Sequence, residues 1–209
     1  MKQFVVFEGL DGSGKSSVIL GVKEILLGEG EKIIIVADPP MIEPWISWKE
    51  YFEQGEKIDK VAEAFMLLAS RIDNTSRIIK KALVRGAIVL ADRYYPSWLA
   101  YQQVRLSDAI GLSEAVMLLD QLQSIVEGHS LVLKPDKIIF LQGDPKVFAQ
   151  RLKKRDGYKS SKYDDLDFQY RVAGAYEQVL ANASCEVFFV DTIDFSLDEV
   201  ITQVMNYIH

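Results

Sequence analysis

The strongest constraint on this chain is a glycine-rich segment near its amino end. Residues 4–17 read FVVFEGLDGSGKSS, in which an apolar run leads into the pattern G-x-x-x-x-G-K-S. A chain that passes abruptly from a buried strand into a helix needs glycine, because glycine permits positive φ angles and close approach of the backbone. Backbone N–H groups then converge at a helix amino terminus, where they bind phosphate oxygens. The segment therefore predicts a strand, a phosphate-binding loop and a helix.

The residue types in this loop indicate a nucleoside triphosphate. In such a loop the lysine, here Lys15, reaches the β- and γ-phosphates, and the next hydroxyl, Ser16, coordinates Mg²⁺. A glycine-rich turn can also match the pattern by chance, but apolar side chains recur after it at helical spacing, which favours the phosphate-binding interpretation. The residues predicted to hold the nucleotide phosphates are Gly9, Gly12, Ser13, Gly14, Lys15, Ser16 and Ser17.

Composition indicates one soluble domain. The 209 residues are 49% hydrophobic and 26% charged, without a low-complexity stretch, so we expect a single domain over residues 1–209. A net charge of −6 argues against a general nucleic-acid coat. No apolar run approaches the length of a membrane span, and the amino end leaves no room for a signal peptide before the first strand. Cys185 is the only cysteine, which excludes an internal disulfide and favours a reducing, cytoplasmic location.

Short apolar runs alternate with helical patterns along the chain. Further strands are predicted at 32–37, 87–91, 137–141 and 187–190, and helices at 58–85, through about 128, near 145–155, from about 165 and at 196–208. Trp45 and Trp48 fall in a proline-containing segment that we interpret as either a loop over the site or a packed turn. The alternation predicts an α/β fold with a doubly wound, five-stranded parallel sheet, in which ligands bind outside the strand carboxyl ends.

Three other segments indicate what binds beside the phosphate loop. Residues 92–102 read DRYYPSWLAYQ, and residues 65–71 read FMLLASR. Residues 151–163 read RLKKRDGYKSSKY, and residues 167–176 read DFQYRVAGAY. These segments resemble, in turn, the strand-end segment, the acceptor-base helix and the mobile lid of thymidylate kinases. The likeness runs in register from Phe4 to about Tyr176, so the chain resembles the thymidylate kinase family of P-loop nucleoside monophosphate kinases.

The resemblance implies transfer of a phosphoryl group from ATP, with Mg²⁺, to a nucleoside monophosphate, above all dTMP. It implies that Asp11 lies near the acceptor sugar, that Arg93 holds the acceptor phosphate and that Arg71 hydrogen-bonds the acceptor base. It also implies that Arg151 lies against the donor adenine and that cations of a short lid at about 155–165 cover the transferring group. The other implied residues are Asp38, Leu67, Ser97, Tyr101 and Gln102 in the acceptor site and Asp92 beside Ser16 at the metal. A homodimer is also implied.

The chemistry of phosphoryl transfer supports these roles, because it depends on alignment and on cations around developing negative charge. Lys15 and Arg93, with one or more of Arg155, Lys159 and Lys162, provide those cations. Plainer interpretations exist for several residues. Arg71 and Arg93 can be surface ion-pair residues, the basic run a solvated face, and Trp98 and Tyr101 core aromatics.

Two positions depart from the family pattern. Ala37 stands where thymidylate kinases usually carry an arginine after the second strand, and Leu67 stands where a phenylalanine commonly stacks on thymine. In the lid, Lys162 replaces a frequent arginine, and lysine cannot make bidentate contacts to phosphate. Because Ala37 and Leu67 lie in the acceptor site, two alternatives stay open: a kinase of this fold with another nucleotide or nucleoside acceptor, and a nucleotide-binding regulatory protein with weak turnover.

Overall fold

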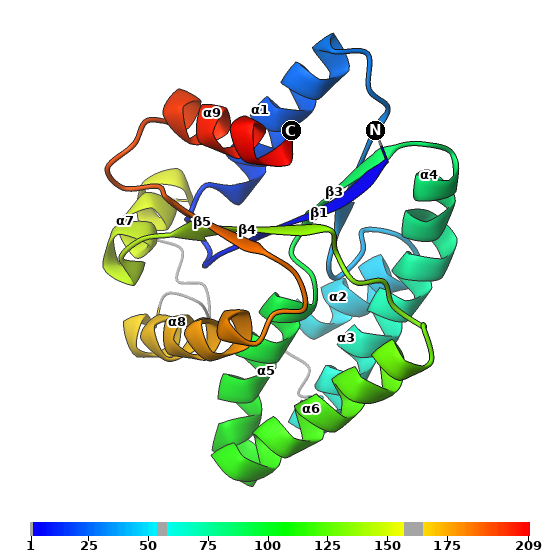
Figure 1. Ribbon diagram of the computed structural model, residues 1–209. Coiled ribbons are helices and arrows are strands. Elements are labelled where there is room, and N and C mark those ends of the chain that lie inside the picture. Colours follow the sequence, from blue (N-terminus) through cyan, green and yellow to red (C-terminus); the bar gives the residue numbers. More distant parts are fainter. Residues whose placement is uncertain (1, 54–57, 157–164) are drawn as a thin grey trace.

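The protein is built around a five-stranded parallel sheet, described in a computed structural model that covers residues 2–53, 58–156 and 165–209 (Figure 1). The strands are β1 (Gln3–Glu8), β2 (Ile33–Ala37), β3 (Ile88–Asp92), β4 (Lys137–Gln142) and β5 (Val187–Asp191). Their order across the sheet is β2-β3-β1-β4-β5, and every pair is parallel. The doubly wound, five-stranded sheet predicted from the sequence is therefore confirmed.

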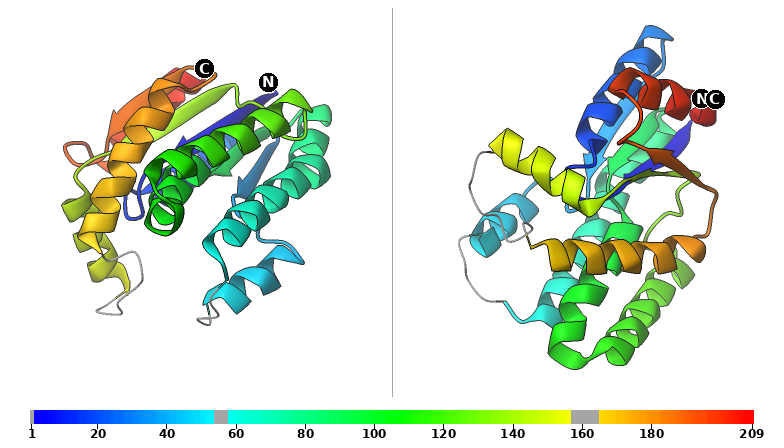
Figure 2. Two further views of the ribbon diagram at one scale, coloured as in Figure 1. Left: turned by 90° about the horizontal axis from the view of Figure 1, so that it is seen from below. Right: turned by 90° about the vertical axis from the view of Figure 1, so that its left-hand side faces the viewer.

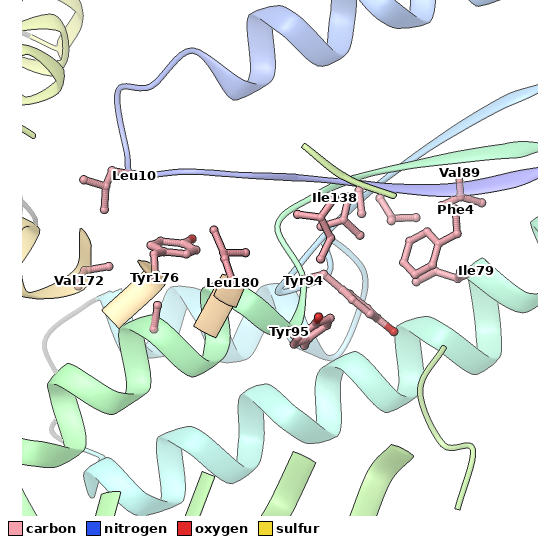
Figure 3. Packing of buried hydrophobic residues seen from close by; sticks show 14 of the residues in the cluster. Phe4, Leu10, Ile79, Val89, Tyr94, Tyr95, Ile138, Val172, Tyr176 and Leu180 are labelled. Atoms are coloured by element: carbon pink, nitrogen blue, oxygen red, sulfur yellow. The ribbon is translucent and has the colours of Figure 1, made fainter. Parts of the chain in front are cut away.

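The strands are apolar on both sides because helices cover both faces of the sheet. Alternate residues of β1 enter different cores: Val5 and Phe7 pack with α1 (Lys15–Gly28) and α9 (Leu197–Ile208). Phe4 and Val6 pack on the opposite face with α4 (Lys80–Val84), α5 (Tyr95–Ile110) and α8 (Leu166–Ala181). Figure 1 shows α5 and α8 on that side of the sheet, and Figure 3 shows Phe4 pointing toward it. All four side chains are buried, as a doubly covered central strand requires.

A second helical layer lies on the side of the sheet that α5 and α8 cover. Helices α3 (Lys60–Asn74) and α6 (Leu112–Gly128) pack with α5 through a separate cluster that includes Ala64, Trp98 and Leu119 (Figure 2). The remaining helices are α2 (Trp45–Glu53), the π-helical segment η1 (Thr75–Ile79) and α7 (Pro145–Asp156). Helix starts follow the sequence: Asp59 and Asp165 accept backbone N–H groups of the first turns of α3 and α8, and Ser196 and Glu199 form a capping box on α9.

The predicted elements agree with the structure except between residues 39 and 53. The predicted helix over 58–85 is found as α3, η1 and α4 in succession. The segment around Trp45 and Trp48, interpreted from its prolines as a loop or turn, instead forms α2. The indole Nε1 of Trp45 donates to Asp73 Oδ2 at 2.8 Å, so a tertiary contact with the end of α3 supports this short helix. Most of the predicted lid, residues 157–164, lies outside the described residues.

None of the helices in the described part of the chain is both long and apolar enough to cross a membrane.

Candidate active site

The carboxyl ends of three adjacent strands bring the predicted site residues together. Phe7 of β1 and Ala37 of β2 both pair with Asp92 of β3, so these strands end at nearly the same level. The backbone N–H of Arg93 donates to Phe7 O at 3.0 Å, and that of Asp38 donates to Asp92 O at 3.1 Å. The chain segments that follow β1, β2 and β3 therefore leave the sheet side by side.

The loop after β1 has the geometry of a phosphate cradle. Gly9, Gly12 and Gly14 have φ angles of 141°, 85° and 96°, which L side chains rarely adopt. A Cβ at Gly9 would lie 2.6 Å from Leu141 O, and one at Gly12 would lie 2.5 Å from Phe148 O. Gly14 is the N-cap of α1, so the loop delivers the chain directly to a helix amino terminus. Such a terminus presents unpaired N–H groups to an anion.

Lys15 lies inside the curve of this loop. Its Nζ donates to Gly9 O at 3.0 Å and to Leu10 O at 2.9 Å, and the side chain is buried. Burial, and then the positive charge of Arg93, lower the pKa of Lys15 to about 8. The ammonium group is thus positioned at the centre of the cradle. Of the other predicted loop residues, Ser13 is buried, while Ser16 and Ser17 are exposed on the first turn of α1.

Ser16 and Asp92 form a pair of oxygen donors beside the cradle. The Ser16 hydroxyl donates to Asp92 Oδ2 at 3.1 Å. Hydroxyl and carboxylate oxygens suit Mg²⁺, which usually keeps several waters and binds through one or two protein oxygens and substrate phosphates. Within the described ranges there is no cluster of three or more His, Cys, Asp or Glu side chains that would hold a metal alone. The donor set therefore fits a metal bound chiefly through a nucleotide.

Arg93 is the centre of a hydrogen-bonded cluster of side chains. Its Nη2 donates to Asp11 Oδ1 at 2.6 Å and to the Tyr101 hydroxyl at 3.3 Å, and its Nη1 donates to Ser97 Oγ at 2.9 Å and to the Tyr176 hydroxyl at 3.0 Å. Burial opposes the charge on Arg93, but its partners outweigh that effect and raise its pKa well above the usual value. The pKa of Asp11 lies below its usual value. Burial alone would raise it, but the positive charges of Arg93 and Lys15 outweigh burial and lower it.

The alternative that Arg93 is a surface ion-pair residue is excluded by this geometry. The side chain is only 16% exposed, and its partners come from the phosphate loop, α5 and α8. Its guanidinium carbon also lies 5.0 Å from the centroid of the Tyr101 ring. Arg93 therefore joins the loop of Lys15 to the helices on the acceptor side.

Glu8, the last residue of β1, is a buried carboxylate that sequence analysis did not assign to the site. Its Oε1 accepts the backbone N–H groups of Tyr94 and Ser97 at 2.9 and 3.3 Å, and its Oε2 accepts the hydroxyls of Ser97 and Tyr176. Burial raises the pKa of Glu8 although Arg93 opposes this. The signal available in the sequence was a lone acidic residue at the end of an otherwise apolar strand.

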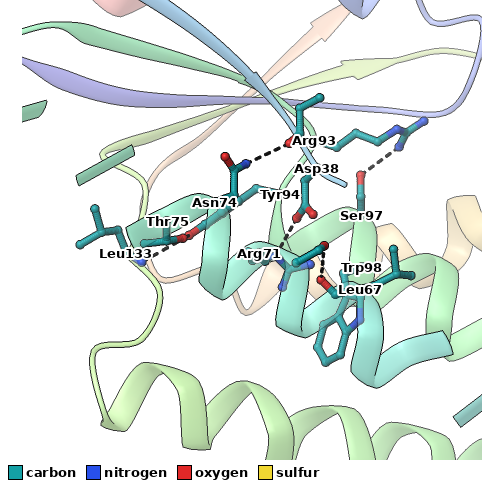
Figure 4. Close-up of polar contacts among 12 residues, drawn as sticks. Asp38, Leu67, Arg71, Asn74, Thr75, Arg93, Tyr94, Ser97, Trp98 and Leu133 are labelled. Atoms are coloured by element: carbon teal, nitrogen blue, oxygen red, sulfur yellow. Dashed lines mark hydrogen bonds and ion pairs between the residues drawn. The ribbon is translucent and has the colours of Figure 1, made fainter. Parts of the chain in front are cut away.

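Arg71 is buried rather than solvent-facing. It is 1% exposed, and its Nε donates to Asp38 Oδ2 at 2.6 Å (Figure 4). The guanidinium carbon lies 5.4 Å from the Tyr94 ring centroid and 5.1 Å from that of Trp98. Its Nη1 has no hydrogen-bond partner in the part of the chain that the structure describes. One donor of a buried guanidinium is therefore unused within this part of the protein, beside Leu67 (Figure 4).

The remaining predicted acceptor residues lie on α5 near Arg71 and Arg93. Ser97 and Tyr101 bind Arg93, as described, and Gln102 is 2% exposed. Its Oε1 lacks a hydrogen-bond partner among the described residues. Trp98 is a core aromatic, since it is buried and its Nε1 donates to Ala64 O at 3.1 Å. The face of α5 toward α3 thus carries both unsatisfied polar groups and packing residues.

A cavity lies farther along α5, toward α8. Its volume is about 330 Å³, and its lining consists of Lys60, Arg105, Asp108, Ala109 and Phe168. The Phe168 ring packs 6.1 Å from the Tyr101 ring, measured between centroids, so the cavity adjoins the acceptor residues. Small-molecule sites commonly have volumes from roughly 300 to 1,000 Å³.

The predicted donor-side arginines are on α7. The Arg151 Nη2 donates to Thr192 O at 2.6 Å, in the turn after β5, and its guanidinium lies 5.6 Å from the Phe148 ring centroid. Arg155 is exposed on the last turn of α7, and its charge contributes to the lowered pKa of Asp11. Helix α7 lies against the phosphate loop, since a Cβ at Gly12 would lie 3.1 Å from Leu152 Cγ, and Arg155 follows Leu152 on this helix. Lys159 and Lys162 lie outside the described residues.

A parallel sheet with a phosphate cradle after its central strand, and a buried, hydrogen-bonded arginine at the end of the adjacent strand β3, defines a P-loop phosphotransferase of the nucleoside monophosphate kinase class. The thymidylate kinase family model matches residues 7–204. The chain belongs to the thymidylate kinase family, whose members are phosphotransferases that act on nucleotides.

Individual relatives agree with this assignment. The thymidylate kinase of Caldicellulosiruptor saccharolyticus is 31% identical over 178 residues, which are 85% of this chain and 82% of that protein. The probable thymidylate kinase of Pyrobaculum aerophilum is 31% identical over 205 residues, covering 98% of this chain and 95% of that protein. The crystal structure of thymidylate kinase from Ehrlichia chaffeensis has the same fold, with a TM-score of 0.72, 24% identity and coverage of 99% and 98% of the two chains.

Proposed function

We propose that this protein transfers the γ-phosphoryl group of ATP to thymidylate, giving thymidine diphosphate. The observation that carries the proposal is the juxtaposition of two cationic groups at one sheet edge. Lys15 is enclosed by the phosphate loop, and Arg93 is tied to the same loop through Asp11 at 2.6 Å. A donor phosphate chain at Lys15 and an acceptor phosphate at Arg93 would meet between them, as in-line transfer requires.

The protein residues act by binding and orienting. The N–H groups of the loop and Lys15 hold the donor phosphates, and Arg155 adds positive charge beside Asp11. Asp11 lies near the acceptor sugar and steadies Arg93, which holds the acceptor phosphate. Arg151, tied to the turn after β5, supports the donor adenine.

Mg²⁺ belongs to this proposal as the ion that neutralises charge on the donor phosphates. Ser16 would hold the ion and Asp92 would act through water, a proposal supported by their oxygen chemistry and their 3.1 Å separation.

Recognition of the acceptor base falls to the unused polar groups of α3 and α5. Arg71 Nη1 offers a donor and Gln102 Oε1 an acceptor, matching a base edge with adjacent carbonyl and N–H groups. Asp38 fixes Arg71, while Ser97 and Tyr101 complete the acceptor wall. Leu67 supplies apolar contact without an aromatic ring.

We place the reaction in one domain, residues 1–209, with a short lid at about 155–165. The protein works as a homodimer in the cytoplasm, with nucleotides as its small-molecule partners and without nucleic acid. The family assignment and the single cysteine, Cys185, support these statements.

The proposal is tested by a coupled ADP-release assay with ATP and Mg²⁺. The acceptors are dTMP, dUMP, UMP, CMP, AMP, GMP and thymidine, and Lys15→Ala serves as the blank. We expect turnover that depends on Lys15 and prefers dTMP. Preference for another acceptor would show that thymidylate is not the substrate and would assign the change in specificity to Ala37 and Leu67. ATP binding without turnover on any acceptor would contradict kinase activity and support a regulatory role.

A further inference from the structure

Arg93 is hydrogen-bonded not only to the phosphate loop but also to side chains of α5 and α8. Asp11 and Tyr101 bind its Nη2, whereas two hydroxyls, of Ser97 and Tyr176, bind its Nη1. We propose that Glu8 and Tyr176 are positioning residues that orient Arg93 toward the acceptor phosphate. The inference rests on the proposed function, since Arg93 is assigned there to the acceptor phosphate.

Glu8 connects three parts of the fold at one point. It ends β1, it accepts two backbone N–H groups at the start of α5, and it accepts the Tyr176 hydroxyl from α8 at 2.9 Å. With the Ser97 hydroxyl, the described residues direct four donors at its two oxygens. A carboxylate has about four lone-pair positions for hydrogen bonds, so these donors satisfy it without Arg93.

The two hydroxyls transmit this arrangement to Arg93. Each hydroxyl has one hydrogen to donate and lone pairs that accept. Ser97 Oγ and the Tyr176 hydroxyl are also hydrogen-bonded to each other at 2.6 Å, so one of the two hydroxyl hydrogens serves this contact as well as Glu8. Both oxygens keep lone pairs for Arg93 Nη1, which lies 2.9 Å from Ser97 Oγ and 3.0 Å from the Tyr176 hydroxyl. Glu8 thus orients both hydroxyls so that their lone pairs accept hydrogen bonds from the Arg93 guanidinium.

Tyr176 suits this role because it keeps its proton. Burial, and then the neighbouring Glu8, raise the pKa of Tyr176 well above its usual value. Its ring is packed among buried apolar side chains, including Leu10, Val172 and Leu180 (Figure 3), and the edge-on Tyr101 ring lies 6.2 Å away between centroids. A hydroxyl on a ring fixed in this way has little freedom to move from Arg93.

Neither proposed residue reaches a substrate. Glu8 and Tyr176 are both 0% exposed, so their effect on the reaction passes through Arg93. Arg93 has a long side chain with several rotatable bonds, and fixing it before the acceptor binds lowers the entropy cost of binding. Loss of this support would therefore weaken recognition of the acceptor's phosphate and leave recognition of its base intact.

The test compares Tyr176→Phe and Glu8→Gln with the native protein. Both changes keep the side-chain volume, so the core stays filled. Tyr170→Phe is the matched control, because Tyr170 lies on the same helix and its exposed hydroxyl bonds Asp144, outside the Glu8 network. Calorimetry gives the dissociation constants of dTMP and thymidine, and steady-state kinetics give KM for dTMP and for ATP.

We expect each variant to weaken dTMP binding by about tenfold to a hundredfold, the size of a lost hydrogen bond to a charged group. Thymidine binding and KM for ATP should change less than twofold, and the Tyr170→Phe protein should match the native one. In an Arg93→Ala background, Tyr176→Phe should have no further effect, because its partner is gone.

Equal weakening of dTMP and thymidine binding would overturn the proposal, as would a full Tyr176→Phe effect in the Arg93→Ala background. Unchanged dTMP binding in both variants would also overturn it. These outcomes differ from failure of the proposed function, in which the native protein itself shows no phosphoryl transfer. A thermal denaturation scan verifies that each variant is folded before binding is compared.

Discussion

Arg93 illustrates how the conformation of one residue serves the site. Its φ angle is 72°, in the left-handed region that non-glycine residues rarely occupy. For an L residue this conformation costs roughly 1–2 kcal/mol. The turn lets the backbone N–H bond to Phe7 O while the side chain extends to Asp11. The network around its guanidinium offsets this backbone strain.

We expect Lys15 to make the affinity for ATP sensitive to pH. Its pKa of about 8 means that the ligand-free protein loses the ammonium charge as the pH rises through that value. We expect the ATP dissociation constant to increase between pH 7.5 and 9.5, because only the charged form attracts phosphate strongly. Calorimetry at constant ionic strength measures the change.

The control is Lys15→Arg, whose guanidinium stays charged across this range. Its dissociation constant, whatever its size, should be independent of pH there. An equally steep change in Lys15→Arg would assign the titration to another group.

At the residue scale, local spacing identifies a short pattern such as the phosphate loop, but it does not identify pairs of residues that lie far apart in the sequence. Lys15 and Ser16 belong to one short pattern, and the structure places them on one turn. Arg71 was predicted as an acceptor-site residue, but its bond to Asp38 joins positions 33 residues apart. Glu8 was missed because its partners Ser97 and Tyr176 lie 89 and 168 residues away. Their proximity depends on strand order and helix packing, which local spacing does not specify.

The helices show that one substitution can have opposite effects in different elements. Gly174 lies at an exposed position of α8, and a Cβ there would meet nothing within 4 Å. Gly21 of α1 faces α9, and its Cβ would lie 2.2 Å from Ile201 Cδ1. Alanine is favoured over glycine within a helix by about 1 kcal/mol when space permits.

We therefore expect Gly174→Ala to raise the free energy of unfolding by about 0.5–1 kcal/mol. Gly21→Ala should lower it, because α1 and α9 would have to separate or Ile201 change rotamer. Urea denaturation followed by circular dichroism measures both. The double change Gly21→Ala with Ile201→Val removes the clashing methyl and should recover stability relative to Ile201→Val alone. A stabilising Gly21→Ala would contradict the close packing of these helices.

At the element scale, periodicity predicted the strands and long helices because their burial pattern is continuous. Helix α2 was not predicted, since Pro39, Pro40 and Pro44 suggested irregular structure and the contact from Trp45 to Asp73 is tertiary. The π-helical segment η1 was also not distinguished, because its apolar spacing merges with that of α3 and α4.

For the whole molecule, the proposed homodimer predicts a solution particle of two chains. Large apolar side chains are exposed on the second helical layer, including Phe65 of α3 at 46% and Met117 of α6 at 56%. Burying them against a second copy would be favourable. Size-exclusion chromatography with light scattering should give twice the mass of one chain.

Replacing both Phe65 and Met117 with glutamate should give single chains. Val84→Glu is the control, because Val84 is 84% exposed on α4, away from that layer. A native protein that elutes as one chain at micromolar concentration would refute the homodimer.

The polarity of the sheet also has a practical consequence. The phosphate loop and Arg93, to which we assign the nucleotide phosphates, lie at the carboxyl edge of the strands, whereas α9 ends at the opposite edge. There the Lys137 ammonium bonds the carbonyls of Tyr207 and Ile208. The end of α9 lies close to the start of β1 (Figure 2). A peptide tag, a fluorescent fusion or an attachment to a sensor surface at either terminus would therefore point away from the nucleotides. Either end can serve as a handle for single-molecule or biosensor work.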